Sequence, residues 1–130
     1  MTRRTLLLAL VPACAALLFG QSEDKEGRAW LDANQKTPPE VNVTGVWQAA
    51  DWGRIPLSQR EGGRTVIGTG DAWDISGVVS GNEVYLLFSH RGKVAFSAKL
   101  TSESPGILTG VYTAGLLSSN SKTRPMRLLK

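Results

Sequence analysis

Short apolar runs separated by turn-forming residues fill the chain from residue 41 to residue 130. Within these runs apolar side chains recur at every second position, the period that places them on one face of a β-strand. We count about eight runs, which is the spacing expected of hairpins joined in series. The pattern therefore predicts an all-β fold. The runs are 41–48, 54–58, 64–70, 73–79, 83–89, 94–100, 107–114 and 126–130.

The fifth run differs from the others because it is apolar on both faces. Val84, Leu86 and Phe88 share one side, and Tyr85 and Leu87 share the other. A strand with two apolar faces is buried on both sides or faces a partner subunit. Both interpretations remain open at this point.

The connections between the runs are short, and none is long enough for a crossover. Consecutive strands joined by hairpins make an up-and-down antiparallel meander, and closing the meander removes its exposed edges. At 130 residues the chain has room for one domain. We therefore predict one small closed β-barrel over residues 41–130, preceded by a signal peptide and a short arm.

Residues 1–22 have the three-part pattern of a secretory signal peptide. Two arginines come first, then an uncharged apolar stretch, then small residues at Gly20 and Ser22. This predicts export to the periplasm or the extracellular space, a mature chain that begins at Glu23, and no membrane span in that mature chain. The residues before Cys14 also resemble a lipobox, so the alternative is a lipoprotein anchored at Cys14.

Residues 23–40 are charged at their start and end in two prolines, Pro38 and Pro39. Such a composition predicts a flexible N-terminal arm that stiffens just before the first strand. Trp30 and Leu31 are its large apolar residues, and a single helical turn that caps one end of the barrel with Trp30 is the alternative.

The charge of the chain excludes some classes of function. The formal net charge is +4, and removing the two leader arginines leaves 13 basic against 11 acidic residues, or +2. Because the basic residues are scattered singly, we expect no nucleic-acid partner. The one cysteine lies in the leader, so the mature chain has no disulfide and no thiol nucleophile.

Residues suited to catalysis or metal binding are few. His90 is the sole histidine and falls in a predicted turn, so we expect neither a metal site nor a catalytic triad. Asp71 and Asp74 flank Trp73 without the spacing of a calcium loop. We therefore predict a protein that is not an enzyme and has no cofactor. A small secreted hydrolase stays as an alternative that would need Asp51, Asp71 and Asp74 to converge.

The sequence Thr-Gly-Val-Trp at residues 44–47, with Leu-Thr-Gly-Val-Tyr at 108–112, resembles the calycins, the family of lipocalins and avidins. The resemblance implies an eight-stranded barrel in which Gly45 and Trp47 are structural and close one end. It also implies a basic residue of the last strand across the tryptophan, which would be Arg127 or, less well placed, Arg124. The avidin residues that grip biotin are missing, so the resemblance implies a fold and no ligand.

Aromatic residues are the best candidates for a binding site. Trp52 lies in a turn where packing does not require an aromatic ring, and Trp73 is expected at the same end of the barrel. With Tyr85 and Tyr112, they could stack on a sugar ring or an apolar ligand, or else plug the mouth. We therefore predict an exported, non-catalytic barrel that binds a small apolar ligand or a protein partner. The alternative is a structural or envelope-associated module without a ligand cavity.

Overall fold

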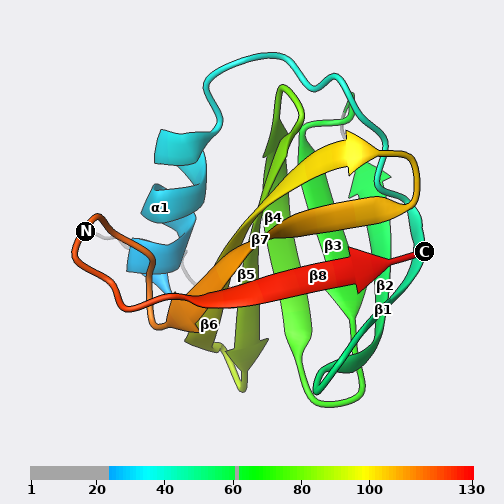
Figure 1. The fold of residues 1–130 in the computed structure, drawn as a ribbon. Coiled ribbons are helices and arrows are strands. Elements are labelled where there is room, and N and C mark those ends of the chain that lie inside the picture. The colour runs from blue at the N-terminus through cyan, green and yellow to red at the C-terminus, as the bar shows by residue number, and fades with distance from the viewer. Residues whose placement is uncertain (1–23, 61) are drawn as a thin grey trace, which may run out of the picture.

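The computed structural model describes residues 24–60 and 62–130 as one closed β-barrel with a helix on its outer surface (Figure 1). The eight strands follow one another around the barrel in chain order, and each is antiparallel to the next. The predicted eight-stranded, up-and-down barrel is therefore confirmed. The predicted signal peptide, with Cys14 and the cleavage site before Glu23, lies outside the described residues. The elements are α1 (Lys25–Asn34), β1 (Gly45–Ala49), β2 (Gly53–Arg60), β3 (Thr65–Thr69), β4 (Asp74–Ser80), β5 (Glu83–His90), β6 (Lys93–Ser104), β7 (Ile107–Ala114) and β8 (Arg124–Leu129).

The barrel closes where the first strand meets the last. β8 lies beside β1, but their pairing consists of the single position Gln48 opposite Leu129. By contrast, β1 pairs with β2 at five positions, from Gly45 opposite Leu57 to Ala49 opposite Gly53. The antiparallel register brings the C-terminal ends of β1 and β8 together, so most of each strand extends past the end of the other. The seam is therefore the least continuous part of the barrel wall.

Alternating side chains fill the barrel interior, as the period-2 pattern requires. The third run, whose two faces look alike in sequence, turns Val66 inward and leaves Ile67 42% exposed on the outside. Val43 is buried in the interior although it precedes the first strand. The interior residues are Val43, Trp47, Ile55, Leu57, Val66, Ile75, Val79, Val84, Leu86, Phe88, Ala98, Leu100, Leu108, Met126 and Leu128.

The helix α1 occupies most of the segment for which the sequence predicts a flexible arm. It begins after Asp24, whose carboxylate accepts hydrogen bonds from the backbone N–H groups of Glu26 and Gly27. Such an N-cap stabilises a helix by satisfying donors that have no partner within it. α1 lies against the outer face of β4 and β5 (Figure 1). Its buried Leu31 packs with Tyr85 and Leu87. No helix in residues 24–60 and 62–130 is long and apolar enough to cross a membrane.

The second apolar face of β5 is therefore covered by α1, a helix of the same chain. Tyr85 is 7% exposed and Leu87 is 3% exposed, because α1 lies over them. Trp30 adds its ring edge-on to Tyr85, with the ring centres 5.7 Å apart, and donates a hydrogen bond from Nε1 to the carbonyl of Leu117. Of the two interpretations of this strand, burial on both sides is the one that the structure shows.

The end of the barrel near Trp47 is closed from inside. Trp47 is 3% exposed, and its Nε1 donates a hydrogen bond to the carbonyl of Val43. The cation across the indole ring is Lys130, not Arg127 as the calycin resemblance implies. Met126 and Leu128 face the interior, so Arg127 between them points outward and is exposed.

Candidate functional site

Five aromatic side chains meet at the opposite end of the barrel, which we term the mouth. Trp52 is at their centre, with its ring centre 4.7 Å from that of Phe88, 5.1 Å from that of Tyr112 and 5.3 Å from that of Phe96. Trp73 lies 6.2 Å from Trp52 and 5.5 Å from Phe96. All of these pairs are tilted or edge-to-face, and in the edge-to-face pairs the positive edge of one ring is attracted to the negative face of the other. The rings form one continuous cluster.

The turn between β1 and β2 places Trp52 in this cluster. Asp51 has φ of 69° and Gly53 has φ of 77°, so the chain reverses within a few residues. The backbone N–H of Trp52 donates to the carbonyl of Ala49 and closes the turn. Aspartate and glycine are residues that adopt a positive φ at low cost. The local sequence thus directs Trp52 onto the barrel core, against which it is partly buried.

Trp52 closes the mouth as a plug. Phe88, which it contacts, is fully buried in the interior. Trp73, Phe96 and Tyr112 surround Trp52 and are each only partly buried. Of the two interpretations of these aromatics, an open mouth or a plugged one, the geometry agrees with the plugged mouth.

A pocket of about 400 Å³ lies beside Trp52, at the seam between β1 and β8. It forms where the β1–β2 turn bends away from β8, past the single pair that joins the two strands. Trp52 and Tyr112 supply aromatic rings to its lining, and Met126 supplies an apolar side chain. Asp51 and Arg127, both exposed, provide one charge of each sign. The pocket is therefore aromatic and apolar, with a polar rim.

Three of the four aromatic residues proposed from sequence come together at the mouth. Trp52, Trp73 and Tyr112 belong to the cluster, whereas Tyr85 lies on the outer surface of the barrel beneath α1. The Tyr85 hydroxyl donates to Glu83 Oε1 at 2.8 Å. Burial, aided by this hydrogen bond and by the charge of Glu83, raises the pKa of Tyr85 to about 12.

Phe88 and Phe96 also belong to the mouth, although neither is among the residues predicted for a binding site. They lie directly opposite each other on β5 and β6. The signal available in the sequence is that both residues fall on the inward face of their strands. Counting from the turn at Arg91 and Gly92 would place Phe88 opposite Ala95, and the register shift between Phe88 and Ser89 brings it opposite Phe96 instead.

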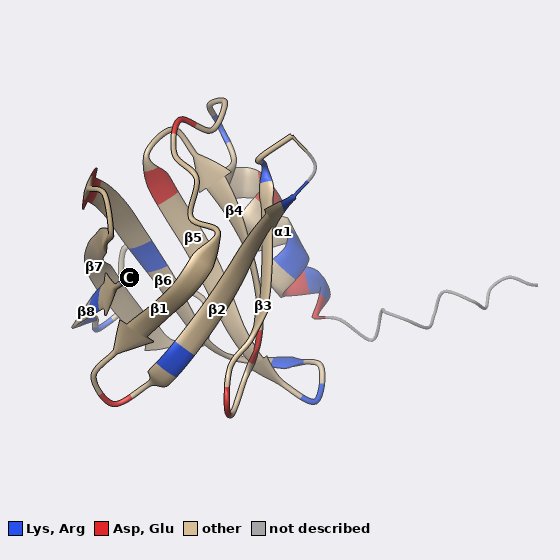
Figure 2. Ribbon diagram, turned by 90° about the vertical axis from the view of Figure 1, so that its right-hand side faces the viewer, with Lys and Arg blue, Asp and Glu red and all other residues tan. Residues whose placement is uncertain are grey.

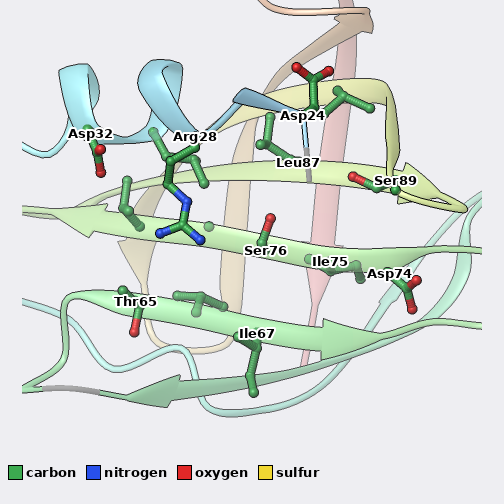
Figure 3. Close-up of a pocket in the computed structure, with 16 residues that line it drawn as sticks. Asp24, Arg28, Asp32, Thr65, Ile67, Asp74, Ile75, Ser76, Leu87 and Ser89 are labelled. Atoms are coloured by element: carbon green, nitrogen blue, oxygen red, sulfur yellow. The ribbon is translucent and has the colours of Figure 1, made fainter. Parts of the chain in front are cut away.

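A second depression, the α1 groove, lies outside the barrel between α1 and the outer faces of β3 and β4 (Figure 3). Its volume is about 500 Å³. Arg28 extends from the helix over the strands toward Ser76, and Ile67 lies on the far side (Figure 3). Asp24 and Asp32 from the helix side line it as well. This groove has no aromatic lining.

Outside the two pockets, Lys99 and Glu83 form an exposed ion pair, with 3.6 Å between Nζ and Oε2, and the other charged residues are spread over the surface. Lysine and arginine occur on separate strands, on turns and on α1, and acidic residues mark the β1–β2 and β3–β4 turns (Figure 2). His90 is exposed, and its ring centre lies 6.4 Å from that of Trp73. Within the part of the chain that the structure describes, no three His, Cys, Asp or Glu side chains form a group that could hold a metal ion.

Comparisons of the chain with protein-family models, with curated proteins and with solved structures find no match. The resemblance to calycins rests on the strand that carries Gly45 and Trp47 and stays a prediction. The function has to be argued from the geometry of the chain itself.

Proposed function

We propose that this chain is an exported, non-catalytic binding protein that holds a small ligand with a flat apolar face in the pocket beside Trp52. The observation that carries the proposal is the position of the partly exposed aromatic cluster next to this pocket of about 400 Å³. Ligand pockets are commonly lined by aromatic and apolar groups with a few polar groups that fix orientation. Export rests on the signal peptide predicted for residues 1–22.

The chemistry of the lining defines the class of ligand. A flat ring, such as an aromatic ring or the apolar face of a pyranose, would stack against Trp52 or Tyr112. Burying about 100 Å² of apolar surface stabilises a complex by about 2.5 kcal/mol before the entropy of association is counted. At the rim, the Asp51 carboxylate can accept hydrogen bonds from hydroxyl substituents, and the Arg127 guanidinium can donate hydrogen bonds to hydroxyl or carboxyl substituents. We therefore expect weak to moderate affinity for a ring with polar substituents.

Other parts of the fold are less suited to binding a ligand. The barrel interior is occupied by fully buried side chains such as Leu86, Phe88 and Leu100. The alternative of a structural module calls for a filled interior together with an exposed apolar patch at Tyr85 and Leu87. The first condition is met, but α1 covers both side chains. The mouth pocket thus combines aromatic rings, open access and polar rim groups.

Native mass spectrometry of the protein purified from its own host would test this function. The expected result is an added mass that is lost on denaturation and that falls sharply in a Trp52→Leu variant. Trp30→Phe is the matched control, because it changes an indole of α1 and leaves the mouth intact. Intrinsic tryptophan fluorescence titrated with the released compound would then measure its affinity.

Two results would contradict the proposal. One is a bare polypeptide mass together with no fluorescence change on addition of aromatic compounds and methyl glycosides. The other is a bound compound whose occupancy is the same in the Trp52→Leu variant and in the wild-type protein.

A further inference from the structure

The outer surface of the barrel is apolar where α1 lies on it and stays partly apolar beyond the helix. Val78 on β4 and Leu87 on β5 are buried beneath the helix. Ile67, on the adjacent strand β3, lies opposite Ser76 and is 42% exposed. The α1 groove runs between the helix and this isoleucine (Figure 3). An apolar side chain placed in the groove would cover Ile67 and extend the layer that α1 begins.

The length of the groove suits an extended peptide. Its floor includes the β4 residues from Asp74 to Val78. At about 3.3 Å per residue this part of the strand spans about 13 Å, the length of about four extended residues. The hydroxyls of Ser76 and Ser89 also line the groove. In the described part of the chain neither has a hydrogen-bond partner, so both can bind a peptide backbone.

The charge of the groove is opposite in sign to that of the protein. Three carboxylates line it, those of Asp24, Asp32 and Asp74, with one guanidinium, that of Arg28, for a formal charge of −2. The whole chain has a formal net charge of +4. An acidic groove on a basic protein attracts cationic partners and disfavours anionic ones.

From these observations we propose that the α1 groove is a docking surface for an extended peptide segment of a partner protein, about four residues long, in which basic and apolar residues alternate. Because successive side chains of an extended chain point to opposite faces, the apolar ones would lie toward Ile67. The basic ones would lie toward the carboxylates on the rim. This surface is separate from the mouth pocket and does not depend on the function proposed for it.

A synthetic Lys-Val-Lys-Val peptide with blocked ends tests the proposal against a Glu-Val-Glu-Val peptide of the same length. We expect the basic peptide to shift amide and methyl NMR signals of α1, of residues 65–67 and of residues 74–78. Binding would weaken as salt is raised, because the charges are exposed. The acidic peptide would leave these signals in place.

A pair of double variants separates the groove from the overall charge of the protein. The variant D32N/D74N removes two carboxylates from the groove, and D51N/D71N removes two exposed carboxylates from the turns at the mouth. Exposed ion pairs are individually weak and the first variant loses two of them, so it should bind about two- to thirtyfold more weakly than the second. Equal affinities of the two variants, or equal binding of the two peptides, would overturn the proposal. Concentration-dependent shifts of the same signals without peptide would identify a second copy of the chain as the occupant, and would also overturn it.

Discussion

The ammonium group of Lys130 lies 5.7 Å from the centre of the Trp47 ring, so the last residue of the chain is fixed over the first strand. A cation above an indole face at a partly exposed site is stabilising by about 0.5–1 kcal/mol. Gly45 makes this contact possible, because a Cβ atom there would collide with Lys130 Cε. Gly45, Trp47 and Lys130 thus form one packing unit across the seam.

Replacing Gly45 with alanine separates backbone strain at this position from the collision with Lys130. Gly45 has φ of 149°, a conformation in which side chains are strained. We expect Gly45→Ala to lower the free energy of unfolding by about 1–3 kcal/mol, measured by urea denaturation. The loss should persist in a Lys130→Ala background, because the backbone strain remains when the lysine is shortened. Recovery of stability in that background would show that the collision, and not φ, is the cause.

The strands could be predicted because their pattern is local. In β6, the apolar residues Phe96, Ala98 and Leu100 recur at every second position, and no knowledge of other strands is needed to see the period. The partner of Trp47 could not be predicted in the same way. Basic residues stand at 124, 127 and 130, and the pairing of β8 with its neighbours decides which one reaches Trp47. Only Lys130 combines the inward side of the strand with the correct end of the barrel.

The length and position of α1, and with them the α1 groove, could not be predicted because they depend on tertiary contacts. Residues 23–40 contain one pair of large apolar residues, Trp30 and Leu31, and a helix this short has little stability of its own. The outer face of β5 supplies the missing stabilisation through Tyr85 and Leu87. The signal that could have been used is Asp24, which has the side chain of an N-cap directly before the helix.

Leu31 is the large apolar side chain of α1 that is buried against the barrel. It is 6% exposed and packs with Val78, Tyr85 and Leu87. We expect Leu31→Ala to lower the free energy of unfolding by about 2–4 kcal/mol. Amide hydrogen exchange should rise in residues 25–34 more than in the strands. Val46→Ala, at a side chain that is 43% exposed, is the control and should have little effect. Equal effects of the two substitutions would contradict the attachment through Leu31.

Tyr85 should make the stability fall at alkaline pH. Its pKa is raised to about 12 in the folded protein, against an ordinary value of 10.0. Between these values the unfolded chain loses the proton that the folded protein keeps, so stability decreases as pH rises from 10 to 12. We expect the melting temperature of wild-type protein to fall further over this range than that of Tyr85→Phe. Tyr112→Phe, at the mouth, serves as control and should behave as wild type. Parallel melting curves for Tyr85→Phe and wild type would refute the prediction.

The Gln59 side chain on β2 forms hydrogen bonds with the segment that precedes β1. Its Oε1 accepts from the Val43 N–H at 2.7 Å, and its Nε2 donates to the carbonyls of Val41 and Gly63 at 2.9 Å and 2.7 Å. Replacing it with leucine removes all three bonds and leaves the backbone donor of a buried residue without a partner. A loss of about 1–3 kcal/mol in the free energy of unfolding is expected.

Gln59→Glu is the more discriminating substitution at this position. A carboxylate keeps the bond from Val43 but faces the carbonyl oxygens of Val41 and Gly63, which repel it, so the pKa of the new glutamate should lie above its ordinary value. Stability is then retained at pH 4, where the group is protonated, and is lost as pH rises through that pKa. Urea denaturation of the variant and of wild type at pH 4 and pH 7 measures the difference. The exposed Gln48→Glu is the control. If Gln59→Glu were as stable as Gln48→Glu at pH 7, Gln59 would not donate to the two carbonyls.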